Sequence, residues 1–222
     1  MVFVSFENNW YDKETTQRGR IKMADHYYTK QPNTAHHVNE WTFELKNHTF
    51  HFLTDSGVFS KGTVDFGSRV LIDTFTTTGL PEGTLLDVGC GYGPIGLSLA
   101  YATKRQVEMV DINERAVSLA QQNATLNHID TVTIHPSNIY ENVLEARYAA
   151  IVSNPPIRAG KKVVHTILSG AYERLLSGGS LTIVIQKKQG APSAQKKMIE
   201  VFGNAEVIKK EKGYYIIKSI KE

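Results

Sequence analysis

The chain has 222 residues, of which 41% are hydrophobic and 21% charged, and its formal net charge is +3. This length and composition favour one buried α/β core with appendages, and the absence of a run of about 18 uncharged apolar residues argues against a membrane-spanning segment. A single cysteine, Cys90, excludes an internal disulfide bond and a cysteine-based zinc site.

The charge is uneven along the chain. From Pro155 onward, Lys and Arg number 13 whereas Asp and Glu number 5. A basic C-terminal part favours a polyanionic partner, although solvated surface lysines give the same pattern.

Residues 1–22 have no persistent hydrophobic period and predict a loosely attached extension. Their start, MVFVSFENNW, lacks the basic beginning and apolar core of a signal peptide, which favours the cytoplasm. The next segment, 23–56, contains an alternating stretch at 41–54 that predicts a β-hairpin turning near Asn47. Because an isolated hairpin is marginally stable, we expect its apolar face to pack on the main domain, residues 57–222. That face carries Trp41, Phe43, Leu45, Phe50 and Phe52.

Residues 57–76 predict a glycine-rich loop followed by a helix, since Val70, Leu71 and Phe75 form an apolar stripe at helical spacing. A helix just before the next strand would cover one face of a sheet and bring its loop to the ligand cleft. The loop residues expected at this cleft are Phe59, Lys61 and Asp65, for which an ordinary loop role is the alternative.

Strands and helices alternate from residue 84. Near-continuous apolar strands separated by helices predict a mostly parallel sheet covered on both faces. The connection between the last two strands, 210–213, is too short for a crossover, so those strands are expected to be antiparallel neighbours. The expected strands are 85–88, 107–111, 132–135, 149–153, 181–186, 205–209 and 214–219, and the expected helices are 94–103, 114–126, 162–176 and 193–202.

The stretch 84–97, TLLDVGCGYGPIGL, predicts a strand that enters a tight glycine turn and a helix N-terminus, where backbone closely approaches an adenosine-containing cofactor. Gly91, Gly93 and Gly96 satisfy the GxGxxG pattern of nicotinamide dinucleotide domains. Asp87 argues against that cofactor because its carboxylate would repel a pyrophosphate, as does Pro94 within the last glycine interval. A carboxylate suits the ammonium group of S-adenosylmethionine.

Residues at the ends of the next two strands support an adenosine site. Asp111 is placed to accept hydrogen bonds from both ribose hydroxyls, which fits either cofactor. Ile112 offers an apolar wall for adenine, and Asn113 is expected to cap the following helix. Asn138 is placed to bond the adenine edge, although a turn asparagine would look the same.

The stretch 151–162, IVSNPPIRAGKK, ends a strand at the expected ligand edge of the sheet. Two prolines fix the backbone and remove two donors, leaving carbonyl oxygens free to accept. The Asn154 side-chain carbonyl and the Pro155 carbonyl could hold both hydrogens of an exocyclic amine or amide, with Pro156 fixing the turn. Holding the nitrogen lone pair toward a methyl donor predicts an in-line methyl transfer driven mainly by positioning.

DVGCGYG, VDIN and SNPP, in this order, resemble class I S-adenosylmethionine-dependent methyltransferases that modify amino nitrogens. FSKGTVDFGSRVLI and NPPIRAGKK are similar to the small-domain group that includes the small-subunit ribosomal RNA guanine-N2 enzymes. The resemblance spans about residues 24–219 and implies a Rossmann-like, seven-stranded sheet with an antiparallel last strand. It also implies that Asp87 and the glycines surround the methionine part of the cofactor, that Asp111 binds the ribose and Asn138 lies near adenine, and that Asn154, Pro155 and Pro156 lie at the acceptor nitrogen. Together with the residues predicted from their place in the chain, the expected cofactor site is Phe59, Lys61, Asp65, Asp87, Gly89, Cys90, Gly91, Gly93, Pro94, Ile95, Asp111, Ile112, Asn113, Asn138 and Asn154.

Two departures concern the substrate. Many amino-methylating relatives have an aromatic residue directly after NPP, where this chain has Ile157, and some carry a second, degenerate domain ahead of the catalytic one. Base stacking is then expected from Phe59 or from the plane of Arg158. The residues expected to contact substrate are Ile157, Arg158, Lys161, Lys162, Lys187 and Lys188, the lysines through RNA phosphates or else simply solvated.

The sequence therefore predicts an S-adenosylmethionine-dependent N-methyltransferase acting on a guanine N2 amine of 16S ribosomal RNA. Its expected partner is ribosomal RNA or the small ribosomal subunit, with no membrane and no metal. Three alternatives remain open: the same reaction on a protein glutamine amide or tRNA adenine N6, a non-catalytic RNA-binding assembly factor, and a dehydrogenase.

Overall fold

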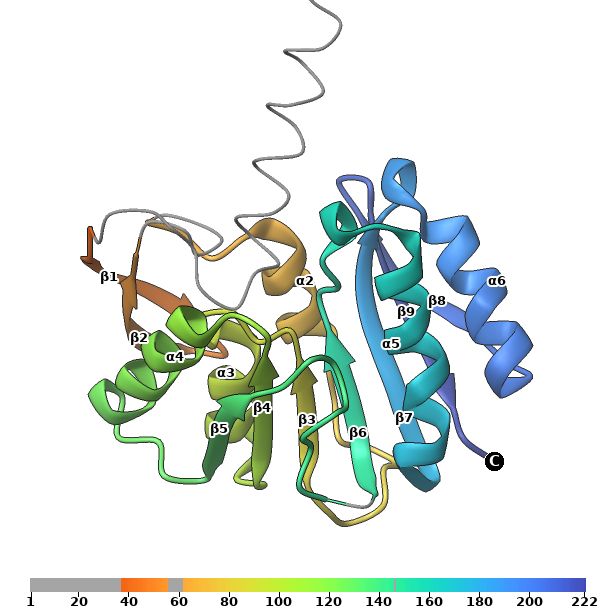
Figure 1. Cartoon of the computed structure of the whole chain (residues 1–222), viewed down its shortest axis with the longest axis horizontal. Coiled ribbons are helices and arrows are strands. Elements are labelled where there is room, and N and C mark those ends of the chain that lie inside the picture. The colour runs from red at the N-terminus through yellow and green to blue at the C-terminus, as the bar shows by residue number, and fades with distance from the viewer. Residues whose placement is uncertain (1–36, 56–61, 146) are drawn as a thin grey trace, which may run out of the picture.

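The computed structural model describes residues 37–55, 62–145 and 147–222. Within these ranges a seven-stranded sheet lies beside a two-stranded hairpin (Figure 1). The hairpin consists of β1 (Asn39–Leu45) and β2 (His48–Thr54). The sheet strands are β3 (Leu85–Val88), β4 (Val107–Asp111), β5 (Val132–Pro136), β6 (Tyr148–Ser153), β7 (Leu175–Gln186), β8 (Glu206–Glu211) and β9 (Tyr214–Ile220). The helices are α2 (Phe66–Thr74), α3 (Pro94–Thr103), α4 (Glu114–Leu126), α5 (Lys161–Arg174) and α6 (Ala191–Phe202), with short 3-10 turns η1 (Ile157–Ala159) and η2 (Lys187–Gln189).

The sheet has the strand order β5-β4-β3-β6-β7-β9-β8. The pairs from β5 through β7 are parallel, whereas β9 pairs antiparallel with both β7 and β8. The predicted mostly parallel sheet with an antiparallel end is therefore confirmed. The last strand lies between β7 and β8, and β8 forms the charged edge.

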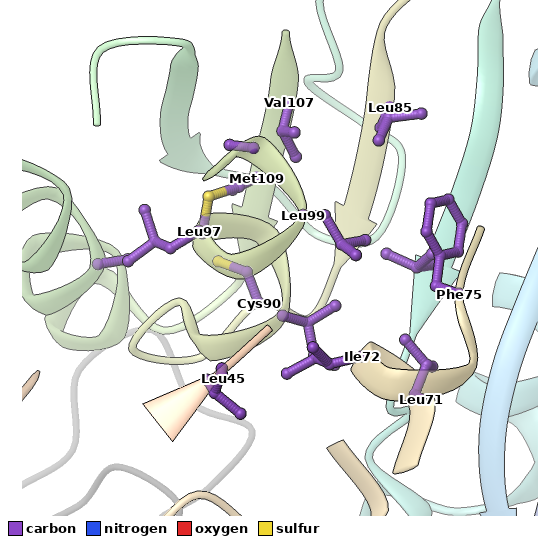
Figure 2. Packing of buried hydrophobic residues seen from close by; sticks show 14 of the residues in the cluster. Leu45, Leu71, Ile72, Phe75, Leu85, Cys90, Leu97, Leu99, Val107 and Met109 are labelled. Carbon is purple, nitrogen blue, oxygen red and sulfur yellow. The ribbon is translucent and has the colours of Figure 1, made fainter. Parts of the chain in front are cut away.

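Buried side chains form one cluster on each face of the sheet. Leu85 points toward the cluster made with α2, α3, α4 and the hairpin, which Figure 2 shows in part. Its neighbour Leu86 points toward the cluster made with α5 and α6. This alternation is expected for strands buried on both faces, and no helix among the described residues is long and apolar enough to cross a membrane.

The hairpin packs on the main domain, as predicted. Its turn places Lys46 and Asn47 at positive φ, and Phe50 and Phe52 are fully buried. The Asn123 amide of α4 accepts from the Leu53 N–H (2.7 Å) and donates to the Leu53 carbonyl (3.1 Å). One helical turn later, Asn127 makes the same pair of bonds with the backbone of β2. Two side-chain amides thus take the place of a neighbouring strand along β2.

The connection from β5 to β6 contains no α-helix in its described part, and a buried carboxylate anchors it. Glu108 of β4 accepts from the Tyr148 hydroxyl (2.7 Å) and the Leu144 N–H (2.8 Å), and it pairs with His135 (2.8 Å). With three partners, this buried carboxylate is well satisfied. It anchors the end of this connection beside the start of β6, whereas Ser137 is held at the ligand edge of the sheet by its N–H, which donates to the Asp111 carbonyl at 2.9 Å.

Several element bounds differ from the sequence prediction, most of them by one or two residues, and the largest difference is the start of β7 at Leu175 instead of residue 181. The helix expected to reach residue 176 ends at Arg174, because Leu175 is already extended (φ −93°, ψ 145°) and begins β7. The strand start is irregular, since Gly178 has φ +76° and the register with β6 shifts between Tyr148 and Ala150. Apolar residues at 175–176 fit a helix face and a strand equally well. The expected extension at 1–22 and the segment boundary at 56–57 lie outside the described residues.

Candidate active site

Two hollows meet at the carboxyl ends of β3, β4 and β6, and both are bordered by Asn154 and Pro156. The first, here called the glycine-loop cavity, is lined by Val88, Gly89, Gly91, Val110, Asp111, Ile112, Asn113, Ala116, Ser137, Ile139, Asn154, Pro156 and Ile167. The second, the Asn154 cleft, has a volume of about 430 Å³ and is lined by Asp65, Asn154, Pro155, Pro156, Ile157, Arg158, Gln186, Gln189 and Tyr214. Two ligands, one in each hollow, would therefore lie next to each other at Asn154.

The glycine loop turns sharply because its glycines adopt left-handed backbone. Gly89, Gly91 and Gly93 have φ values of 76°, 57° and 100°. The N–H groups of Gly89 and Cys90 both donate to the Val110 carbonyl, at 2.8 and 3.0 Å. No atom lies within 4 Å of the position that a Cβ would take on Gly89 or Gly91. The loop therefore presents bare backbone to open space, as close approach of a ligand requires.

Asp111 joins the glycine loop to the end of β4. Its Oδ2 accepts from the Gly91 N–H (2.9 Å) and its Oδ1 accepts from the Asn113 N–H (2.8 Å). Burial raises the pKa of this carboxyl, and these backbone bonds oppose the rise. Asn113 caps α4, accepting from the Arg115 and Ala116 N–H groups, as predicted. The carboxylate still borders the cavity, where further donors can reach it.

Asp87 lies beneath the loop and is fully buried. Its Oδ2 accepts from the Gly96 N–H of α3 at 2.9 Å, whereas Oδ1 has no partner among the described residues. Burial raises its pKa to about 7, and the neighbouring Asp111 charge adds to the rise. A buried carboxylate oxygen without a partner is costly, so a cationic donor would satisfy it. This unpartnered acceptor fits the ammonium group of S-adenosylmethionine, which donates hydrogen bonds.

Asn154 follows β6 and is held from the opposite side by the N-terminus of α2. Its Nδ2 donates to Asp65 Oδ2 (2.8 Å) and to Ser68 Oγ (3.0 Å). Its Oδ1 makes no hydrogen bond within the part of the chain that the structure describes. The Ser153 hydroxyl just before it donates to the Val88 carbonyl at 2.7 Å, which ties the end of β6 to β3. A carbonyl acceptor is thus available where the two hollows meet.

The predicted site residues are only partly brought together. Those that line the glycine-loop cavity are Gly89, Gly91, Asp111, Ile112, Asn113, Asn154 and Pro156, and those at the Asn154 cleft are Asp65, Asn154, Pro155, Pro156, Ile157 and Arg158. Cys90 and Ile95 are buried in the hydrophobic core, and Pro94 begins α3 next to them. Asn138 donates to Glu141 at 2.7 Å, away from the glycine-loop cavity. Phe59 and Lys61 lie outside the described residues.

The predicted lysines fall on two surfaces. Lys161 and Lys162 line an open groove of about 960 Å³ beside α5, together with Arg174 and Lys197. In this groove, burial and the charges of Lys161 and Lys197 lower the pKa of His165. Lys187 and Lys188 are exposed on η2, directly after β7, at the same edge of the sheet. None of these four lysines lines the Asn154 cleft, whereas the positive side chain of Arg158 does.

Several site residues were missed from the sequence. Ser68 contacts Asn154, and the cleft is walled by Gln186, Gln189 and Tyr214. The two glutamines flank the predicted Lys187–Lys188 pair, so the position after a strand was a usable signal. For Tyr214 no local signal exists, because its place depends on β9 lying beside β7. The described residues contain no group of three or more His, Cys, Asp or Glu that could hold a metal.

Known proteins resemble this chain over most of its length. A family model described as Methyltransferase small domain matches residues 49–218. A Bacillus subtilis protein named uncharacterized protein YbxB is 54% identical over 201 residues, which is 90% of this chain and all of the relative. Ribosomal RNA small subunit methyltransferase C of Salmonella choleraesuis is 30% identical over 196 residues, which is 86% of this chain and 55% of the relative.

Solved structures of methyltransferases also resemble this chain. The Thermus thermophilus 16S rRNA N2 methyltransferase RsmC, in complex with AdoMet and guanosine, has a TM-score of 0.76 and 25% identity. The match covers 86% of this chain and 52% of that one, so the chain spans about half the length of these methyltransferase C relatives. A Pyrococcus furiosus methyltransferase, at 21% identity and a TM-score of 0.60, shares the fold. The family match and the site geometry together lead to one assignment: the chain belongs to the methyltransferase small-domain family.

Proposed function

We propose that the protein transfers a methyl group from S-adenosylmethionine to the exocyclic N2 amine of a guanine in 16S ribosomal RNA. The observation that carries the proposal is that Asn154 and Pro156 border both the glycine-loop cavity and the Asn154 cleft. A methyl donor in the glycine-loop cavity and a methyl-accepting amine in the Asn154 cleft would therefore lie next to each other at Asn154 Oδ1, which makes no hydrogen bond to the described residues.

The glycine-loop cavity suits the nucleoside part of the cofactor, because Asp111 on its lining would accept from the ribose hydroxyls. Asp87 is buried beneath the loop, outside the cavity lining, and its unpartnered Oδ1 would accept from the ammonium group. Ile112 and Ile139 offer apolar contact to adenine at the far side of the cavity. When bound, S-adenosylmethionine supplies a methyl group activated by a sulfonium. The loop itself contributes close backbone contact at Gly89 and Gly91.

The Asn154 cleft suits a planar amine. The Asn154 Oδ1 and the Pro155 carbonyl accept the two hydrogens of the exocyclic amine, which leaves the nitrogen lone pair directed toward the donor. Such positioning accounts for much of the rate acceleration in a displacement of this kind. The nitrogen can release its proton after attack, so the mechanism needs no strong base. Ile157 and Tyr214 provide the walls of the cleft.

An RNA acceptor explains the surrounding charge. Arg158 borders the cleft, and Lys161, Lys162, Lys187 and Lys188 lie beside it. Cations so arranged would hold phosphates while a base is turned into the cleft. The preference for guanine N2 in ribosomal RNA rests on the relatives named for that reaction. A glutamine amide and an adenine amine present the same two hydrogens and are the competing acceptors.

The decisive experiment incubates the protein and labelled S-adenosylmethionine with small ribosomal subunits, naked 16S RNA, tRNA and a release factor. We expect label in 16S RNA, recovered as N2-methylguanosine by nucleoside mass spectrometry. Label confined to protein or to adenine would overturn the proposed acceptor. Asn154→Ala should reduce transfer to a small residual rate while binding of the cofactor persists, and Gln122→Ala, an amide exposed on α4, is the matched control. Full methylation by Asn154→Ala would refute the role of the Asn154 carbonyl, whereas no transfer by the wild-type protein to any of these acceptors would favour a non-catalytic assembly role.

A further inference from the structure

Asn154 makes its polar contacts with α2, a helix that lies 86 to 89 residues away in the sequence. From this contact we propose that Asp65, assisted by Ser68, is a positioning residue that fixes the orientation of the Asn154 amide and so creates the acceptor for the amine. The inference rests on the proposed function, because it assigns a role to the carbonyl that this function uses.

The chemistry of the two partners determines the orientation of the amide. An ionised carboxylate only accepts hydrogen bonds, and of the two ends of a side-chain amide only the nitrogen donates. Asp65 Oδ2, 2.8 Å from the Asn154 side chain, therefore faces Nδ2, and Oδ1 lies on the other side of the amide plane. A flipped amide would bring Oδ1 against the carboxylate. Asp65 thus excludes the orientation that would present a donor to the incoming amine.

Asp65 is itself held firmly. Its Oδ1 accepts from the Gly67 N–H (2.9 Å), and its Oδ2 accepts from the Ser68 N–H (3.1 Å) and the Ser68 hydroxyl. These bonds cap α2, whose residues Val70 and Leu71 are buried in the core. The Asp65 carboxylate is therefore fixed relative to the sheet, and its hydrogen bond to Nδ2 fixes the Asn154 side chain in turn.

Capping alone does not require an aspartate here. Serine, threonine and asparagine cap helices about as well, but a carboxylate oxygen has the additional lone pairs that serve Asn154 Nδ2. Ser68 completes the arrangement, because its hydroxyl donates to Asp65 and accepts from Asn154. Asp65 borders the Asn154 cleft and not the glycine-loop cavity. Asp65 is therefore assigned to the cleft proposed for the methyl-accepting substrate, whereas the sequence predicted that it contacts the cofactor.

The test separates positioning from capping with two substitutions. Asp65→Ser keeps a capping oxygen and removes the acceptor for Asn154, and Asp65→Asn keeps the cap and turns a second amide toward Asn154. We expect both variants to lower kcat about a hundredfold, the scale of a group misplaced by about 1 Å at a reacting centre. The KM for S-adenosylmethionine should change less than twofold. Ser68→Ala leaves the hydrogen bond from Asn154 Nδ2 to Asp65 in place and should lower kcat only about threefold.

A double substitution shows whether the effect passes through Asn154. In an Asn154→Ala background, Asp65→Ser should lower the residual rate no further. An equal loss in both backgrounds, or a wild-type kcat in Asp65→Ser, would overturn the inference. If Asp65→Ser fails to fold, Asp65→Asn takes its place in the same cycle.

A spectroscopic readout keeps this inference distinct from the proposed function. The Asn154 side-chain amide signals, identified by their loss in Asn154→Ala, should exchange slowly with water and shift in both Asp65 variants. Unchanged signals would refute the positioning role even if methylation is observed. If wild-type protein methylates no RNA, the proposed function fails while the amide measurement still tests the contact.

Discussion

Replacing Asp87 by asparagine removes a buried carboxyl whose pKa is raised from 3.8 to about 7. A difference of about 3 pKa units corresponds to about 4 kcal/mol between the two protonation states. Because the folded value is raised, the stabilising contribution is complete below about pH 3.8 and is lost as the pH rises through about 7. Desolvation is the main reason that the Asp87 pKa is raised. The hydrogen bond from the Gly96 N–H lowers this pKa, and the charge of Asp111 raises it further.

Two measurements follow from this linkage. In urea unfolding, the stability of Asp87→Asn relative to wild type should grow by about 1.4 kcal/mol per pH unit between about pH 4 and 7 and then level off. In calorimetric titration, the wild-type affinity for S-adenosylmethionine should rise with pH over the upper part of this range, since the ammonium group binds the ionised carboxylate. Asp87→Asn should bind weakly and show no such rise.

The control is Asp130→Asn at an exposed position, which makes the same change in formal charge. A stability difference between Asp87→Asn and wild type that stays constant from pH 4.5 to 7.5 would refute the linkage. A cofactor affinity that is equally independent of pH in wild type would remove Asp87 from the ammonium site.

Three further predictions concern packing and buried bonds. Gly96→Ala would place a Cβ 2.7 Å from the Met109 side chain, and overpacking of this kind should cost about 1–3 kcal/mol in urea unfolding. Asn123→Ala would remove the side-chain partner of the partly buried Leu53 N–H and carbonyl in the hairpin, a loss of about 1–3 kcal/mol that should expose the hairpin to limited proteolysis. Tyr148→Phe would take one of three partners from Glu108, and thermal unfolding should show a loss of about 1–3 kcal/mol.

Each of these has a contrary outcome. Wild-type stability for Gly96→Ala would mean that Met109 repacks without strain. For Asn123→Ala, cleavage no faster than in Gln122→Ala would show that apolar contacts alone hold the hairpin. An unchanged melting temperature in Tyr148→Phe would indicate that Glu108 finds another donor.

Local sequence patterns predicted the sheet well because its strands are short apolar runs with sharp ends. The strand Leu85–Val88 and the helix Pro94–Thr103 have the predicted bounds, since glycines and a proline at the first turn delimit them. The bounds of the helix Glu114–Leu126 were also predicted correctly, because the capping residue Asn113 marks its start. These signals lie within a few residues of the boundaries that they define.

The site was less predictable because its contacts join distant segments. NPP indicated an acceptor for an amine, but the bond from Asn154 to Asp65 spans 89 residues and leaves no spacing signal. The cleft wall at Tyr214 requires that β9 lie between β7 and β8, which the short connection between the last two strands did not specify. Local pattern thus predicted Asn154 as a site residue, and only the tertiary structure showed what holds its side chain.

The position of β9 also has a consequence for the order of folding. β8 precedes β9 in the chain, yet in the sheet it contacts β7 only through β9. During synthesis, β3 to β7 can assemble as they emerge, whereas β8 has no sheet partner until β9 is made. Tyr214 then arrives with β9 and packs against Gly67 at the start of α2. The nascent chain would therefore form its glycine-loop cavity before the Asn154 cleft is complete.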